Sequence, residues 1–226
     1  MKKIIALILA CLMLTMSFVA CDKGETETTT DSVENNQTEA PAGDTTVEET
    51  TEAVVELPYK SAIELLQIIF EKYNAAQATD DTKLWVSGGN INNFETCNME
   101  GPAAFVALAD EDYNQNLGIP AAEASKIASA ASMFNMMNAN TFNCFTVQLT
   151  DGTDADAFVN TVKDSILSRQ WICGSPEKLV IAKAPGNYVI VVWGVVEFGG
   201  IVNPVAESFS TSVEGATIVV EENIAR

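Results

Sequence analysis

The sequence predicts an α+β domain over residues 58–226, preceded by a segment of different character. Three observations lead to this prediction. Apolar residues recur at helical spacing in several stretches, short runs rich in Val and Ile alternate with those stretches, and turns containing Gly or Pro separate them. The length of this part of the chain suits one domain with a core of its own.

The first twenty residues have the composition of an export signal. Lys2 and Lys3 precede an apolar run from Ile4 to Ala20, which is the order of a basic region followed by an apolar core. The run is shorter than a membrane-spanning helix normally requires. It ends at Cys21, so we predict a signal peptide over residues 1–20.

The residues around Cys21 resemble the lipobox of bacterial lipoproteins. Phe18-Val19-Ala20 precede the cysteine, although Leu is usual where Phe18 stands. The resemblance implies cleavage before Cys21 and acylation of its thiol, for example with palmitate, so that the lipid bilayer becomes a partner of the chain. Cys11 also ends a lipobox-like stretch, but few apolar residues precede it and the apolar run continues after it. A plain signal anchor is the alternative.

Residues 21–57 are predicted to be a disordered tether. Residues 22–57 contain eleven acidic residues, nine Thr and one Lys, and almost no large apolar side chain before Val54. Such a composition cannot bury enough surface to offset the entropy lost on ordering. We expect residues 21–57 to separate the domain from the membrane surface.

The charge of the chain excludes one class of partner. The formal net charge is −19, and no basic cluster occurs after the signal segment. We therefore expect no nucleic acid partner.

The first half of the domain contains one clear helix. Ser61 and Glu64 form a capping box before apolar residues at helical spacing, which predicts a helix over about 60–76. Residues 84–86 suggest a short strand in a Gly- and Asn-rich stretch, and residues 103–109 fit either a strand or a helical turn. Pro120 and the alanines that follow it predict a helix up to about Met133.

The second half of the domain gives a clearer order of elements. It predicts a strand over 143–150, a helix capped by Thr153 or Asp154 that ends near residues 169–171, and strands around the Pro185-Gly186-Asn187 turn. The strand that follows this turn is apolar throughout, so we expect it to be central. A short helix over about 203–213 and a last strand complete the order β-α-β-β-α-β. This order predicts a ferredoxin-like split βαβ sheet, antiparallel with its helices on one face and N-terminal helices around it.

A second resemblance covers roughly residues 110–195. Met136-Met137-Asn138, an Asp-Gly turn, a helix ending in Ser168-Arg169-Gln170, and Gly186-Asn187-Tyr188-Val189 follow one another as in a family of exported lipoproteins of Gram-positive anaerobes. The resemblance implies a shared fold and a membrane location. The family's domain has no assigned function, so no catalytic residue is carried over from it.

The absence of histidine excludes several kinds of chemistry. The chain has none, so Ser-His-Asp and Cys-His nucleophilic systems and His-ligated zinc are excluded. No Gly-rich phosphate-binding loop occurs. Ser175 and Lys178 match the S-x-x-K motif of penicillin-binding enzymes, but Lys178 begins a predicted strand and the partner motifs are missing.

Two groups of residues raise the question of a metal site. Asp151, Asp154 and Asp156 are spaced as ligands of a hard cation, but the EF-hand pattern is not followed, and turn and capping roles are favoured. Met133, Met136 and Met137 offer thioethers for copper(I), but packing is favoured. We expect no metal and no cofactor.

Three tryptophans and three cysteines remain as candidates. Trp85, Trp171 and Trp193 offer rings for stacking on sugars or peptide. Trp193 lies in a predicted buried strand. Trp171 follows a predicted helix and is expected to be the best exposed of the three, so it is the preferred binding residue. After removal of Cys11 and acylation of Cys21, Cys97, Cys144 and Cys173 are left. A disulfide between Cys144 and Cys173 is one interpretation, and three buried thiols are the other.

These observations favour a lipid-anchored module at the outer face of the cell membrane. Our first hypothesis is a non-enzymatic lipoprotein that binds an envelope protein or polymer. A lipoprotein that binds a solute or ion is the second. A glycan hydrolase that uses a pair of carboxylates is the third, although the sequence gives no reason to choose a pair.

Overall fold

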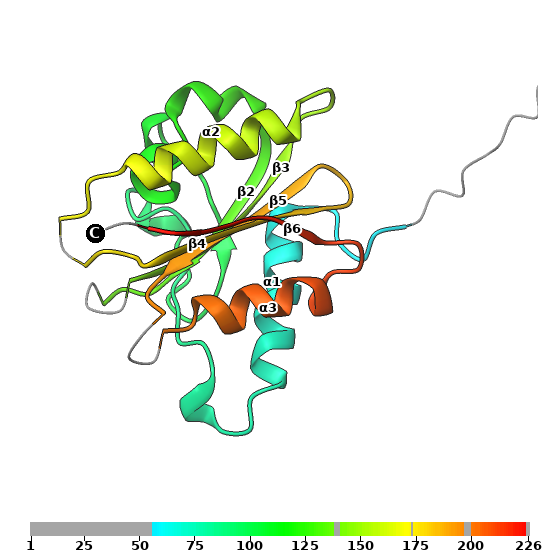
Figure 1. The fold of residues 1–226 in the computed structure, drawn as a ribbon, viewed down its shortest axis with the longest axis vertical. Coiled ribbons are helices and arrows are strands. Elements are labelled where there is room, and N and C mark those ends of the chain that lie inside the picture. Colours follow the sequence, from blue (N-terminus) through cyan, green and yellow to red (C-terminus); the bar gives the residue numbers. More distant parts are fainter. Residues whose placement is uncertain (1–55, 138–140, 173, 197–199, 225–226) are drawn as a thin grey trace, which may run out of the picture. The chain divides into compact units, whose positions relative to one another are not determined.

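The computed structural model describes residues 56–137, 141–172, 174–196 and 200–224 (Figure 1). Residues 53–226 form one compact unit. The helices are α1 (Ala62–Ala75), α2 (Ala155–Ser168) and α3 (Val202–Ser212), and the strands are β1 (Ala103–Ala104), β2 (Ile127–Phe134), β3 (Phe142–Leu149), β4 (Lys178–Ala184), β5 (Tyr188–Gly194) and β6 (Thr217–Asn223). The predicted signal peptide and Cys21 lie outside the described residues.

The strands form one antiparallel sheet in the order β1-β2-β3-β5-β4-β6. The predicted α+β class is therefore confirmed. Strand β5 lies between β3 and β4, and every one of its residues is buried. This confirms the central position expected from its apolar sequence.

Helices cover both faces of the sheet (Figure 1). Ile190 and Val192 of β5 belong to the core beneath α1 and α3, whereas Val189 and Val191 belong to the core beneath α2. Because successive side chains of a strand point to opposite faces, a strand covered on both sides must be apolar at every position.

The helices begin and pack as the sequence predicts. Ser61 caps α1 and Asp154 caps α2, each accepting hydrogen bonds from backbone N–H groups of the first turn. The apolar stripes of the two later helices are buried, at Phe158, Val162 and Ile166 in α2 and at Val205 and Phe209 in α3, with Val213 buried at the C-cap of α3.

The helix predicted from Pro120 to Met133 is wrong. A short 3-10 segment, Ala121–Lys126, is followed by β2. Ala130 and Ala131 are buried on opposite faces of this strand, one in each core. The intrinsic helix preference of alanine is weak, and pairing of β2 with β1 and β3 on its two edges overrides it.

The ferredoxin-like arrangement is not confirmed, although the element order β-α-β-β-α-β is. In that arrangement the last strand would lie beside β3, but β2 occupies that position and β6 pairs with β4 instead. The connection through α2 leads from β3 past β5 to β4, and the connection through α3 leads from β5 past β4 to β6. Both move toward the β6 edge of the sheet, but they start from strands that run in opposite directions. Connections of one handedness then place α2 and α3 on opposite faces, so the expectation of helices on one face is wrong.

The described chain begins beside the β4–β5 turn. The Tyr59 hydroxyl donates a hydrogen bond to the carbonyl oxygen of Pro185 at 3.2 Å, and its ring packs edge-to-face on Tyr188 with centroids 5.0 Å apart. The described chain therefore starts at this end of the sheet.

Candidate functional site

A buried carboxylate organises the irregular segment between α1 and β2. Asp112 accepts hydrogen bonds from the side-chain amides of Asn90 (2.8 Å) and Asn92 (2.6 Å), and from the backbone N–H of Leu108 (2.7 Å). The Asn92 amide, followed by the Leu108 N–H, holds the pKa of Asp112 below its usual value despite burial. This network fixes the shape of a segment whose regular structure is limited to β1 and short helical turns.

Ser132 joins this loop to the sheet. Its hydroxyl donates to the carbonyl oxygen of Gly89 at 2.8 Å and accepts from the Gly89 N–H at 3.1 Å. A Cβ on the neighbouring Gly88 would lie 2.3 Å from the backbone nitrogen of Ala103 and 2.5 Å from the carbonyl oxygen of Ser132. Only glycine therefore allows the loop to approach β2 so closely.

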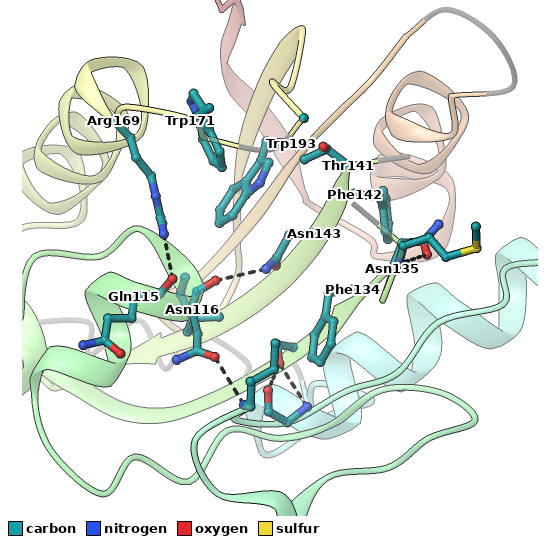
Figure 2. A pocket seen from close by; sticks show the side chains of 16 residues that line it. Gln115, Asn116, Phe134, Asn135, Thr141, Phe142, Asn143, Arg169, Trp171 and Trp193 are labelled. Carbon is teal, nitrogen blue, oxygen red and sulfur yellow. Dashed lines mark hydrogen bonds between the residues drawn. The ribbon is translucent and has the colours of Figure 1, made fainter. Parts of the chain in front are cut away.

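The loop forms one wall of a cavity at the end of the sheet. Phe134 of β2, Asn143 of β3 and Trp193 of β5 are direct neighbours across adjacent strands and line the cavity together. Asn143 donates a hydrogen bond from Nδ2 to the carbonyl oxygen of Asn116 at 3.1 Å (Figure 2). Helix α2 ends at Ser168 on the same face, and the residues that follow it form a further wall.

Arg169 and Trp171 form that further wall. Arg169 follows α2 directly, and its guanidinium group donates to the carbonyl oxygens of Asn114 at 3.1 Å and Gln115 at 2.8 Å. Its Cζ lies 5.0 Å from the centroid of the Trp171 ring, and that ring lies 6.0 Å from the ring of Trp193. Figure 2 shows Trp171 between these two side chains. The stack holds both walls of the cavity together.

The cavity has a volume of about 240 Å³ and is lined by apolar, amide and tryptophan side chains. Two buried polar atoms of lining residues have no hydrogen-bond partner among the described residues: Asn143 Oδ1, an acceptor, and Trp171 Nε1, a donor. An unpaired buried polar group costs about 1–3 kcal/mol. A bound group that paired with either atom would recover part of that cost.

A second cavity, of about 580 Å³, lies beside the first, since Asn135 lines both. Trp85, Met99 and Met136 line the second cavity and are exposed. The next residue, Met137, lines the first cavity and is also exposed. Apolar side chains are thus available to a partner on both sides of the β2–β3 turn.

The three tryptophans differ in how exposed they are to solvent. Trp171 is half-buried in the stack with Arg169. Trp193 is buried, as expected. Trp85 has an exposed fraction of 76%, so it is the tryptophan most available to a partner. The position of Trp171 at the cavity is consistent with its selection as a binding residue, but that role stays a prediction.

The structure describes two of the three cysteines considered for disulfide formation, Cys97 and Cys144. Cys144 is a buried free thiol in the core beneath α1 and α3, and burial raises its pKa. Cys173 lies outside the described residues, so the Cys144–Cys173 disulfide stays a prediction. Cys97 is half-buried, and its thiol lies 3.1 Å from the carbonyl oxygen of Asn90.

The aspartate and methionine groups do not form metal sites among the described residues. Asp154 accepts from the N–H groups of Asp156 and Ala157, as a helix cap does, and Asp156 pairs with Lys183 at 2.7 Å. Met133 is buried, whereas Met136 and Met137 are exposed. No cluster of three or more Asp, Glu, Cys or His side chains suited to a metal occurs in the described ranges.

Lys178 also has a structural partner. It begins β4 and pairs with Glu221 of β6 at 2.5 Å, and Ser175 precedes the strand in a loop rather than opening a helix. The S-x-x-K arrangement of a nucleophile above its lysine is therefore not formed.

Sequence reasoning missed the residues of the cavity floor, Phe134 and Asn143, because they meet only through strand register. Arg169 carried a visible signal, since it is the only arginine of the chain before Arg226 and lies two residues from a tryptophan.

Comparisons with protein families, with curated proteins and with solved structures found no match. The resemblance to exported lipoproteins therefore stays a prediction. Within the described residues, no helix is both long and apolar enough to cross a membrane.

Proposed function

We propose that this protein is a lipid-anchored, non-enzymatic binding module on the outer face of the cell membrane. In this proposal Cys21 carries the lipid, residues 21–57 form the tether, and residues 58–226 bind a protein or polymer of the envelope. One observation supports the proposal: the described chain begins at the opposite end of the sheet from the first cavity.

Strand β5 runs from the end of the sheet where the described chain begins to the end where the first cavity lies. Its first residue, Tyr188, contacts Tyr59 close to the start of the described chain, and Trp193, near its other end, lines the first cavity. At about 3.4 Å per residue, the two positions are about 17 Å apart along the strand. A tether that enters the domain beside Tyr59 would therefore leave the cavities free to face a partner.

The side chains around the cavities support a binding role. Trp85, Met136 and Met137 are exposed there, and Ile172, which follows the cavity residue Trp171, has an exposed fraction of 93%. Exposed tryptophan and methionine are typical of docking surfaces, because tryptophan offers a large rigid area and methionine adapts its shape. We infer that the partner contacts this end of the domain.

The larger cavity favours a second candidate function, binding of a solute. Its volume of about 580 Å³ lies within the range of about 300–1,000 Å³ usual for small-molecule sites. The hydrolase hypothesis has no comparable support, since neither this cavity nor the first is lined by two acidic residues.

Site-specific photo-cross-linking on intact cells tests the proposal. A photoreactive amino acid replaces Met137, and a matched control replaces exposed Asp151 in the turn at the other end of β3. We expect a discrete adduct from position 137 and none from position 151. Equal adducts at both positions, or none at 137, would contradict a docking surface at the cavity end.

A further inference from the structure

We propose that the 240 Å³ cavity binds a carboxylate that is joined to a small apolar group, with Arg169 as its charged partner. The proposal rests on the binding function proposed above and names the ligand chemistry of one part of that surface. Two sources share this chemistry, the C-terminal end of a peptide and a free small carboxylic acid.

The first argument is the charge of Arg169. The domain is strongly acidic, and six of its lysines have a carboxylate within 4.0 Å. Among the described basic side chains only Lys72 and Arg169 lack one. Lys72 donates to the carbonyl oxygen of Ser212 and lines a different cavity with Glu207. Arg169 lines a cavity without any acidic residue, so its positive charge is available to a ligand.

The second argument is the supply of hydrogen-bond donors. Arg169 uses NH1 and NH2 for the carbonyl oxygens of Asn114 and Gln115, and a guanidinium group has five N–H donors in all. Nε1 of Trp171, which lines the cavity, is a buried donor with no partner among the described residues. A group rich in acceptors satisfies such a set, and a carboxylate is one.

Burial of Arg169 adds weight to this argument. Desolvation lowers the pKa of its guanidinium group, and no neighbouring carboxylate opposes that effect. A bound anion would therefore relieve a cost that the unliganded protein carries.

The third argument is the apolar floor and the size of the cavity. Phe134, Leu117 and Trp193 line it, and they offer contact to an apolar group rather than to a second charge. Its volume corresponds to about eight water molecules at about 30 Å³ each. The space suits one amino-acid-sized group.

Calorimetric titration of the full-length chain tests the proposal. The protein is held in a zwitterionic detergent, in Tris buffer free of other carboxylates. The probes are N-acetylleucine and its neutral isostere N-acetylleucinamide. We expect the acid to bind and the amide to bind at least tenfold more weakly. Equal binding of the two, or no binding of the acid, would overturn the proposal.

Variants connect the titration to the cavity. Arg169→Gln should weaken binding of the acid at least tenfold, and Lys72→Gln should leave it unchanged, since Lys72 is the other cation without a carboxylate. Trp171→Phe, which keeps an aromatic but smaller ring and removes the Nε1 donor, should also weaken binding, and it keeps the test valid if Arg169→Gln unfolds. Unchanged affinity in either folded cavity variant would overturn the proposal.

A last pair of probes separates the two sources. A hexapeptide ending in leucine, with a free or an amidated C-terminus, should repeat the preference for the free acid if the ligand is a chain end. Binding of N-acetylleucine alone would assign the cavity to free small acids. Failure of every carboxylate probe would overturn this inference but not the docking surface, which the cross-link at position 137 tests independently.

Discussion

The Thr146 hydroxyl donates a 2.6 Å hydrogen bond to the carbonyl oxygen of Ala62, joining the middle of β3 to the first turn of α1. Thr146 is fully buried. The Ala62 N–H donates to the hydroxyl of Ser129 on β2 at 3.2 Å. Side chains of two neighbouring strands thus fix the start of the helix that covers them.

Thr146→Val should lower the free energy of unfolding by about 1 kcal/mol, because it removes this buried hydrogen bond and keeps the shape of the side chain. Urea unfolding measures the change. Thr161→Val in α2 is the matched control, since its hydroxyl also donates to a backbone carbonyl oxygen, but at an exposed site. An equal loss of unfolding free energy in the control would contradict a larger contribution of the buried Thr146–Ala62 hydrogen bond.

Asp112→Asn should destabilise the loop around the cavity by about 1–3 kcal/mol at neutral pH, because an amide presents N–H donors where the site already supplies donors. Because the folded pKa of Asp112 is lowered, its stabilising contribution is complete above the unfolded pKa of about 3.9 and is lost as pH falls through the folded value. Urea unfolding at several pH values should show the difference between wild type and variant shrinking below pH 4. The exposed Asp110→Asn is the control, and an equal, pH-independent loss there would contradict this role of Asp112.

Cys144 should resist alkylation in the folded protein, because its thiol is buried and its pKa is raised. Mass spectrometry after iodoacetamide treatment measures this, and half-buried Cys97 should react first. After unfolding without reductant, we expect Cys144 to react as a free thiol. A peptide of Cys144 linked to Cys173 would instead support the disulfide interpretation of the sequence.

Cys21→Ser should move the protein from the membrane fraction to the soluble fraction, because each buried methylene of an acyl chain contributes about 0.8 kcal/mol to membrane binding. Immunoblotting of fractionated cells measures the distribution. Cys11→Ser, at the other lipobox-like stretch, is the control and should remain membrane-bound. Membrane retention of the Cys21 variant would contradict the lipoprotein prediction.

Most of the regular elements could be predicted from the sequence, because caps and apolar spacing are local signals. Asp154 shows this for α2, and the apolar run beginning at Tyr188 shows it for the central strand. No strand forms over residues 84–86, where only isolated bridges follow at Ser87 and Gly88. The segment of β2 was misread as a helix because it has small residues buried on both faces and therefore neither alternation nor bulk. That misreading displaced β6 to the wrong edge and α3 to the wrong face.

Less of the candidate site than of the fold could be predicted from the sequence. Trp171 was selected for its position after a helix, and it does line a cavity. Its neighbours Phe134, Asn143 and Trp193 meet only because β2, β3 and β5 pair in one register. Register depends on contacts between distant segments, and no local pattern in the chain encodes it.

The pairing of β3 with β5 has a consequence for folding kinetics. The β2–β3 and β4–β5 pairs join strands that are adjacent in the chain, whereas β3 and β5 are separated by α2 and β4. Closing that longer loop costs entropy before its contacts form. We expect the β2–β3 and β4–β5 hairpins to form early, and the pairing of β3 with β5 to set the folding rate.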